Sequence, residues 1–213
     1  MKTTILNAFD ALPYFTTEAV KQLFDDQVAV GTVQTALYRW TKSGRIIRLK
    51  KGVYMTRRFF EWHRSDAEFA PMISAILIPQ SYLSLEFILQ RNGILTDITY
   101  PVSAVTLKQT RVFENTLGAF TYRNIKKDLY SGFTISEHMG ISIAQATVAK
   151  ALFDYLYFRS ESSIGNNPAE ELRLTLEDFT DTDQDEFASF VEISKSKKMD
   201  RIYKSLRRTI WRQ

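Results

Sequence analysis

The apolar positions of the first 56 residues follow a helical spacing three times and a strand spacing twice. Two β-prone runs, residues 45–49 and 53–56, follow the third helical pattern and are joined by a turn at Gly52. The three apolar stripes are Ile5, Leu6, Phe9 and Leu12 in residues 2–12; Ala19, Val20, Leu23 and Phe24 after a Thr16 or Thr17 cap; and Val33, Ala36, Leu37 and Trp40 in residues 32–43. This order of elements predicts a winged helix-turn-helix.

The face of the third helix opposite its buried stripe carries polar side chains. In a winged helix-turn-helix this face enters the major groove, and the hairpin reaches the neighbouring phosphates. Tyr38 packing locally, and lysines solvating an edge strand, would be the structural alternative. The predicted DNA-binding residues are Thr32, Gln34, Thr35, Tyr38, Arg39 and Lys42 on the helix, and Arg45, Arg48, Lys50 and Lys51 in the hairpin.

Charge supports this prediction and divides the chain into three blocks. Nine basic residues and one acid lie between Arg39 and Arg64. Residues 1–64 carry a net charge of +6 (11 basic, 5 acidic), residues 65–194 carry −9 (9 basic, 18 acidic), and residues 195–213 carry +7 (8 basic, 1 acidic). A basic first block suits a nucleic-acid partner, whereas the acidic middle would repel a phosphate backbone and is expected to bind a protein.

The middle of the chain alternates helical and β-prone patterns. A helix is predicted up to Gly93, several β-prone runs between residues 98 and 136, and helices over residues 141–159, 168–179 and 183–193. We therefore expect an α+β protein: a winged helix-turn-helix over residues 1–58, then a mixed α/β domain over residues 59–213 with a mostly antiparallel sheet and C-terminal helices.

The basic tail has the pattern of an amphipathic helix. Its apolar stripe could lie on an anionic membrane, dock on the acidic middle of the protein, or leave the basic face to contact DNA or an acidic partner. Docking is the interpretation that we favour, with the outward arginines free to touch a partner. The stripe consists of Met199, Ile202, Tyr203, Leu206 and Ile210.

Composition narrows the remaining possibilities. The 213 residues are 45% hydrophobic and 24% charged, which is ordinary globular composition, and they include no cysteine. The longest apolar run, residues 72–78, is too short to span a bilayer, and an acid at Asp10 interrupts the N-terminus too early for a signal peptide. We expect a soluble, cytoplasmic protein without a membrane partner.

Enzymatic chemistry has little support in the sequence. His63 and His138 lie outside any spaced set of metal ligands, and no glycine-rich phosphate loop precedes a helix. The acids of residues 177–186 could gather a divalent ion, and Glu192 with Lys195 is the nearest approach to a nuclease motif. We expect no catalytic residue, metal or cofactor, and predict that the protein is not an enzyme.

Three stretches, in order over roughly residues 10–160, carry a resemblance to a known family. They are a helix–glycine–basic-strand run ending in Gly52-Val53-Tyr54, a "YLSLEFILQRNGILTD" block, and the "AKALFDYLYFR" helix. Together they resemble the AbiEi-type antitoxins of abortive-infection (type IV) toxin–antitoxin systems. The chain departs from the family at Ala149, where a glutamate usually precedes the lysine.

The resemblance implies a transcriptional autorepressor that binds double-stranded DNA of its own promoter through the winged domain. It also implies an antitoxin against a nucleotidyltransferase-like toxin in phage defence. The alternatives are a plain winged-helix regulator without a toxin partner, or a nuclease-like enzyme. The operator and the oligomeric state stay open. The motif residues, for which the resemblance gives no role, are Tyr82, Ser84, Glu86, Lys150 and Asp154.

Overall fold

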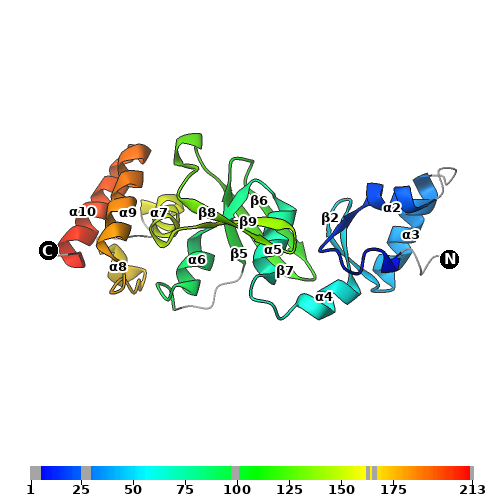
Figure 1. Ribbon diagram of the computed structural model, residues 1–213. Coiled ribbons are helices and arrows are strands. Elements are labelled where there is room, and N and C mark those ends of the chain that lie inside the picture. Colours follow the sequence, from blue (N-terminus) through cyan, green and yellow to red (C-terminus); the bar gives the residue numbers. More distant parts are fainter. Residues whose placement is uncertain (1–5, 25–29, 97–100, 162–163, 165–166, 212–213) are drawn as a thin grey trace.

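The computed structural model describes residues 6–24, 30–96, 101–161, 164 and 167–211. Three groups of elements follow one another along an elongated molecule, with the two termini at opposite ends (Figure 1). A small α/β region forms the N-terminal end, a six-stranded sheet flanked by helices lies in the middle, and helices form the C-terminal end. The protein is therefore α+β, as predicted.

Over residues 15–24 and 30–56, the N-terminal region consists of helices α2 and α3 and a three-stranded antiparallel sheet in the order β1-β3-β2. The Thr16 hydroxyl caps the first helix by accepting from the Ala19 amide at 3.1 Å. Gly44 (φ +70°) and Gly52 (φ +76°) adopt the left-handed conformation at the two turns that follow the second helix. The elements are β1 (Phe15–Thr16), α2 (Thr17–Leu23), α3 (Val30–Lys42), β2 (Ile46–Lys50) and β3 (Val53–Thr56).

Within the described residues, the helix predicted over residues 2–12 ends earlier than expected. Residues 6–7 form a helical fragment and residues 8–11 are turns, while residues 1–5 lie outside the described residues. Phe9 instead stacks on Phe15 of β1, with ring centroids 4.4 Å apart. β1, which the sequence pattern did not predict, pairs with β3.

The central sheet has the strand order β6-β7-β5-β4-β9-β8. It is mixed rather than mostly antiparallel, because β4 pairs in parallel with β9 and β5 pairs in parallel with β7. The other three pairings are antiparallel. The strands are β4 (Ser81–Leu83), β5 (Val102–Thr106), β6 (Arg111–Asn115), β7 (Gly118–Asn124), β8 (Phe133–His138) and β9 (Ile141–Ala146).

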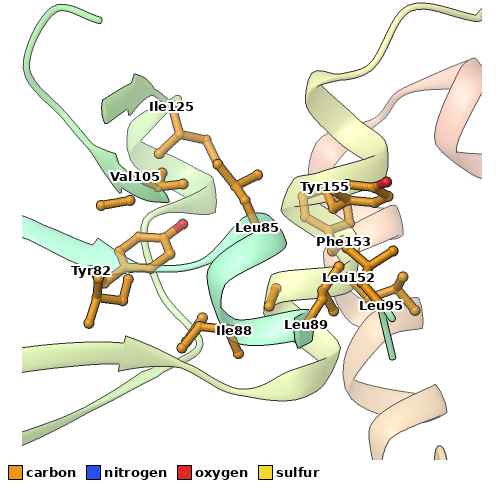
Figure 2. Close-up of a cluster of buried hydrophobic side chains, with 14 of the residues drawn as sticks. Tyr82, Leu85, Ile88, Leu89, Leu95, Val105, Ile125, Leu152, Phe153 and Tyr155 are labelled. Atoms are coloured by element: carbon orange, nitrogen blue, oxygen red, sulfur yellow. The ribbon is translucent and has the colours of Figure 1, made fainter. Parts of the chain in front are cut away.

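Helices cover both faces of this sheet. On one face, α5 packs on β4, β5 and β9, and Ser74 of α5 meets the Tyr122 hydroxyl of β7 at 3.1 Å. On the other face lie α6 and α7, which pack on each other with Leu89 and Leu95 near Leu152 and Phe153 (Figure 2). These helices are α4 (Arg57–His63), α5 (Phe69–Leu77), α6 (Leu85–Arg91) and α7 (Val148–Phe158), and a short 3-10 helix (Lys127–Leu129) precedes β8.

Two predicted helices are wrong in extent. The helix expected over residues 141–159 is divided, because residues 141–146 form β9 and Thr147 then caps α7 by accepting from the Lys150 amide at 3.1 Å. The helix expected over residues 168–179 is limited to α8 (Pro168–Glu171), and Arg173 adopts φ +51° shortly after it.

The C-terminal end consists of α9 (Asp181–Ser194) and α10 (Lys197–Thr209), which pack on each other. A capping box between Thr180 and Asp183 begins α9. Met199, Ile202 and Leu206 of α10 are buried, which confirms docking of the tail through most of its predicted stripe. Tyr203 is half-buried, and Ile210, the last residue of the stripe, is 43% exposed. Within the described residues, no helix is both long and apolar enough to cross a bilayer.

The hairpin of β2 and β3 joins the N-terminal region to the central domain. One face, including Ile46, packs on α3 and its neighbours, while Ile47, Leu49 and Met55 belong to the core of the central sheet. The Asn115 side-chain amide of β6 donates to the Leu49 carbonyl at 3.3 Å. The division expected at residue 58 stays a prediction, and packing is continuous across it.

Candidate nucleic-acid interface and a buried polar cluster

A groove of about 620 Å³, called the α3 groove, lies between the start of α2, α3 and the β2–β3 hairpin. The buried stripe predicted for α3 is confirmed, so its polar face is turned outward. Tyr38 is 62% exposed. The Thr17 amide donates to the Gly52 carbonyl at 3.0 Å and holds the hairpin tip against α2. Four predicted residues line the groove: Gln34, Tyr38, Arg48 and Lys51.

Five other predicted residues are exposed but do not line the α3 groove. The Thr35 hydroxyl donates to the Gly31 carbonyl at 2.8 Å, so its lone pairs remain available to a partner. The Lys42 ammonium lies 5.7 Å from the centre of the Tyr38 ring. These five residues are Thr32, Thr35, Arg39, Lys42 and Arg45.

Lys50 has a different role from the predicted one. Its ammonium donates to the carbonyls of Ile76 at 2.9 Å and Leu77 at 2.7 Å, at the C-terminal end of α5. A cation is favourable there because the last carbonyls of a helix carry partial negative charge. Burial, and then the charge of Lys108, lower the pKa of Lys50. Lys50 therefore fixes the hairpin to α5, and its predicted role in binding phosphate is wrong.

A second cleft, called the hairpin cleft, has a volume of about 730 Å³ and lies where the hairpin meets the β5–β6 connection. Lys51, Lys108 and Arg111 line it together with Lys50, and no carboxylate is among its described lining residues. Sequence analysis missed Lys108 and Arg111 because they belong to a block with net charge −9. Their proximity to the hairpin appears only in three dimensions.

Four of the five motif residues meet in one buried cluster. Asp154 Oδ1 lies 2.7 Å from the Lys150 ammonium, and Asp154 Oδ2 accepts from the hydroxyls of Tyr82 at 2.9 Å and Ser84 at 2.8 Å. All four side chains are 0% exposed. The Lys150 ammonium also lies 4.7 Å from the centre of the Phe190 ring. The cluster thus ties β4 and the start of α6 to α7.

Burial controls the protonation of this cluster. It raises the pKa of the Asp154 carboxyl and lowers the pKa of the Lys150 ammonium, and each charge partly opposes the shift of the other. Burial and the nearby carboxyl also raise the pKa of Tyr82, so its hydroxyl stays a donor. Because no atom of the four side chains reaches solvent, a substrate could not touch them in this conformation, and the cluster is suited to a structural role.

Gly132 is part of the packing around the cluster. Its φ of +75° favours glycine, and its carbonyl accepts from the Thr147 amide at 2.9 Å. A Cβ at this position would lie 2.4 Å from Phe190 Cζ and 3.1 Å from the Lys150 side chain. Gly132 therefore has a packing role in addition to its conformational one.

Glu86, the fifth motif residue, does not join the cluster. Its carboxylate lies 3.8 Å from the Arg159 guanidinium, and both side chains are 34% exposed. A pair of this distance and exposure contributes little to stability.

The candidate enzymatic residues do not come together in the described part of the chain. His63 contacts the Phe59 ring, with centroids 4.4 Å apart, and His138 lies 3.1 Å from Asp66. Glu192 is exposed on α9, and Lys195 ends that helix at φ +51°. Among the described residues, no group of three histidines and carboxylates is arranged to hold a metal ion.

Comparison with known proteins adds no identification. No model of a protein family matches the chain, and no curated protein matches it either.

Proposed function

We propose that this protein is a transcriptional regulator that binds double-stranded DNA through a winged helix-turn-helix formed by α2, α3 and the β2–β3 hairpin. The observation that carries the proposal is the α3 groove, where the exposed polar face of α3 and the hairpin cations Arg48 and Lys51 share one surface. Residue types that read bases and residue types that hold phosphates thus lie side by side.

In this proposal α3 enters the major groove. Gln34, Thr35 and Tyr38 face base edges, while Arg48 and Lys51 neutralise phosphates beside them. The hairpin cleft extends the basic surface to Lys108 and Arg111, which would hold the backbone further along the duplex. Lys108 and Arg111 of the central domain thus take the place of Lys50 as phosphate contacts.

A mobility-shift titration with the DNA upstream of the gene tests the proposal. Lys51→Glu should weaken binding to every sequence, whereas Thr35→Ala should change the ranking of operator variants. Arg207→Glu, an exposed change on α10 away from these surfaces, is the matched control and should leave binding unchanged. Absence of retardation at low salt, or equal losses in Lys51→Glu and Arg207→Glu, would overturn it.

The resemblance to AbiEi-type antitoxins extends the proposal to autorepression and to neutralising a nucleotidyltransferase-like toxin. The observation that favours it is the cluster of Tyr82, Ser84, Lys150 and Asp154, because residues from two separate motif stretches form one structural unit. Their burial indicates that they shape the domain, so the toxin would contact other residues.

Coexpression tests this second part separately. If a nucleotidyltransferase-like protein is encoded beside the gene, the full chain should restore growth to cells that express it, and Lys51→Glu should still do so. A gene neighbourhood without such a protein, or failure to restore growth, would leave a plain winged-helix regulator as the proposal.

A further inference from the structure

A hollow of about 660 Å³ lies beside the β6–β7 hairpin, on the sheet face that carries α6 and α7. Thr121 and Arg123 alternate along β7 with the buried Phe120 and Tyr122, so they point to this face. The start of α6 and the C-terminal half of α7 form the other walls, and Leu85 and Tyr155 are among their lining residues. We call it the arginine hollow, after Arg111, Arg123 and Arg159 in its lining.

The charge of this hollow is opposite to that of its surroundings. Residues 65–194 carry nine basic and 18 acidic residues, yet three of the nine basic residues line this one space. Among the described lining residues Glu86 is the carboxylate, and its distance of 3.8 Å from Arg159 makes it a weak partner. Arg111 is paired with Tyr122, whose hydroxyl meets Ser74 of α5, so the Arg111 side chain extends toward the hairpin cleft and only its strand edge borders the hollow. Arg123 and Arg159 bring the guanidinium groups of this face, and an anion would be attracted to both.

Arg159 is held in place before any ligand binds. Its Nη2 donates to the Tyr155 hydroxyl at 2.6 Å, and its guanidinium lies 4.1 Å from the centre of the Tyr155 ring. Its Nε is buried without a hydrogen-bond partner among the described residues. A stacked, fixed guanidinium loses little freedom when it binds a phosphate by two parallel hydrogen bonds.

A comparable hollow of about 720 Å³ lies between α8 and α10, but its described lining lacks unpaired arginines of this kind. Its cations are already paired, since Arg201 lies 2.8 Å from Glu161 and Lys204 lies 2.7 Å from Asp200. An anion there would have to displace existing partners. In the arginine hollow, by contrast, Arg111 and Arg123 have no ion pair within the part of the chain that the structure describes.

The rest of the lining is apolar or carries hydroxyls. Val112 is 59% exposed, and Pro101 and Phe158 also line the hollow. Leu85, labelled with Tyr155 in Figure 2, has a φ of +59°, a conformation that is strained in a residue other than glycine and is frequent at ligand sites. The volume is within the range of small-molecule sites.

We propose that the arginine hollow binds a nucleoside phosphate. The phosphates would lie between Arg123 and Arg159, and the flat base would cover Val112. The two guanidinium groups suit the phosphate, and the apolar floor suits an aromatic ring that inorganic anions lack. This site is separate from the α3 groove, and the inference does not depend on DNA binding.

Isothermal titration of the full chain with the four nucleoside triphosphates, and with inorganic tripolyphosphate as the charge-matched probe, tests the proposal. At least one nucleotide should bind at least about tenfold more tightly than tripolyphosphate, and Arg123→Glu should weaken it about tenfold or more. Val112→Asp should weaken it as well, while the control Arg207→Glu should not. Thermal denaturation shows that each variant is folded.

Three results would overturn it. One is no saturable binding of any nucleotide at millimolar concentration. Another is equal affinity for tripolyphosphate, or equal loss in Arg207→Glu, which would indicate diffuse charge attraction. The third is a loss of DNA affinity in Arg123→Glu without nucleotide binding, which would assign the hollow to the DNA backbone instead.

Discussion

At the scale of single residues, Lys150 and Asp154 form an ion pair that no solvent reaches. Removing one member of a buried pair leaves an uncompensated charge, so Lys150→Met should lower the free energy of unfolding by about 3–5 kcal/mol. In this variant Asp154 loses the ammonium that opposes the rise of its pKa. Lys150→Met combined with Asp154→Asn removes both charges and should recover part of the loss.

The pH dependence of that loss has a definite sign. The folded-state pKa of Asp154 lies above its ordinary value of 3.8, so the folded form binds more protons than the unfolded form. Stability is therefore lost as the pH rises from the ordinary pKa through the folded-state pKa. Urea unfolding should therefore show a larger deficit for Lys150→Met at about pH 8 than at about pH 5, and little such difference for the double variant. A Lys150→Met protein as stable as the wild type at both pH values would contradict the structural role of the pair.

At the scale of elements, α10 docks through a narrow apolar stripe while its other faces are basic. Leu206 is 0% exposed, and the Lys198 ammonium donates to three carbonyls at the end of α7, including that of Tyr157 at 2.6 Å. Leu206→Ala should therefore cost about 2–5 kcal/mol of unfolding free energy. The exposed control Arg207→Glu should change it by no more than about 0.5 kcal/mol.

Thermal denaturation of the two variants checks this prediction. The difference should also appear as a lower melting temperature for Leu206→Ala than for Arg207→Glu. Equal melting temperatures would mean that α10 is not docked, and the basic tail would then be available as a whole to a partner.

Elements with strong periodicity could be predicted from the sequence, and α3 is the clearest case. Its stripe of Val33, Leu37 and Trp40 is buried as expected because it fits a helix and no strand. The helix predicted over residues 141–159 also included residues 141–146. The alanines at 144 and 146 do not distinguish a helix from a strand. Pairing of β9 with both β4 and β8 decides in favour of the strand, and that information is not local.

The candidate site shows the same limit. Exposure of Thr35, Tyr38 and Arg48 follows from local periodicity, which the sequence contains. The direction of Lys50 depends on α5, an element 26 residues further along the chain, and the hydrogen bond of Tyr82 to Asp154 joins residues 72 positions apart. Such contacts follow from packing of the whole chain.

At the scale of the whole molecule, the basic surface runs from the α3 groove across the hairpin to the central domain. Lys50 and Lys51, which are adjacent in the hairpin, have different roles in this arrangement. Lys51 is exposed and lines both the α3 groove and the hairpin cleft, whereas Lys50 holds the carbonyls at the end of α5. DNA binding and attachment of the hairpin should therefore be separable by single substitutions.

The salt dependence of DNA affinity for Lys51→Ala and Lys50→Met tests this account most directly. Each phosphate contact contributes about 0.9 to the slope of log affinity against log salt concentration. The account predicts that Lys51→Ala reduces the magnitude of the slope by about 0.9 at unchanged stability. It also predicts that Lys50→Met keeps the slope and lowers the melting temperature. A slope unchanged by Lys51→Ala, or reduced equally by Lys50→Met, would contradict it.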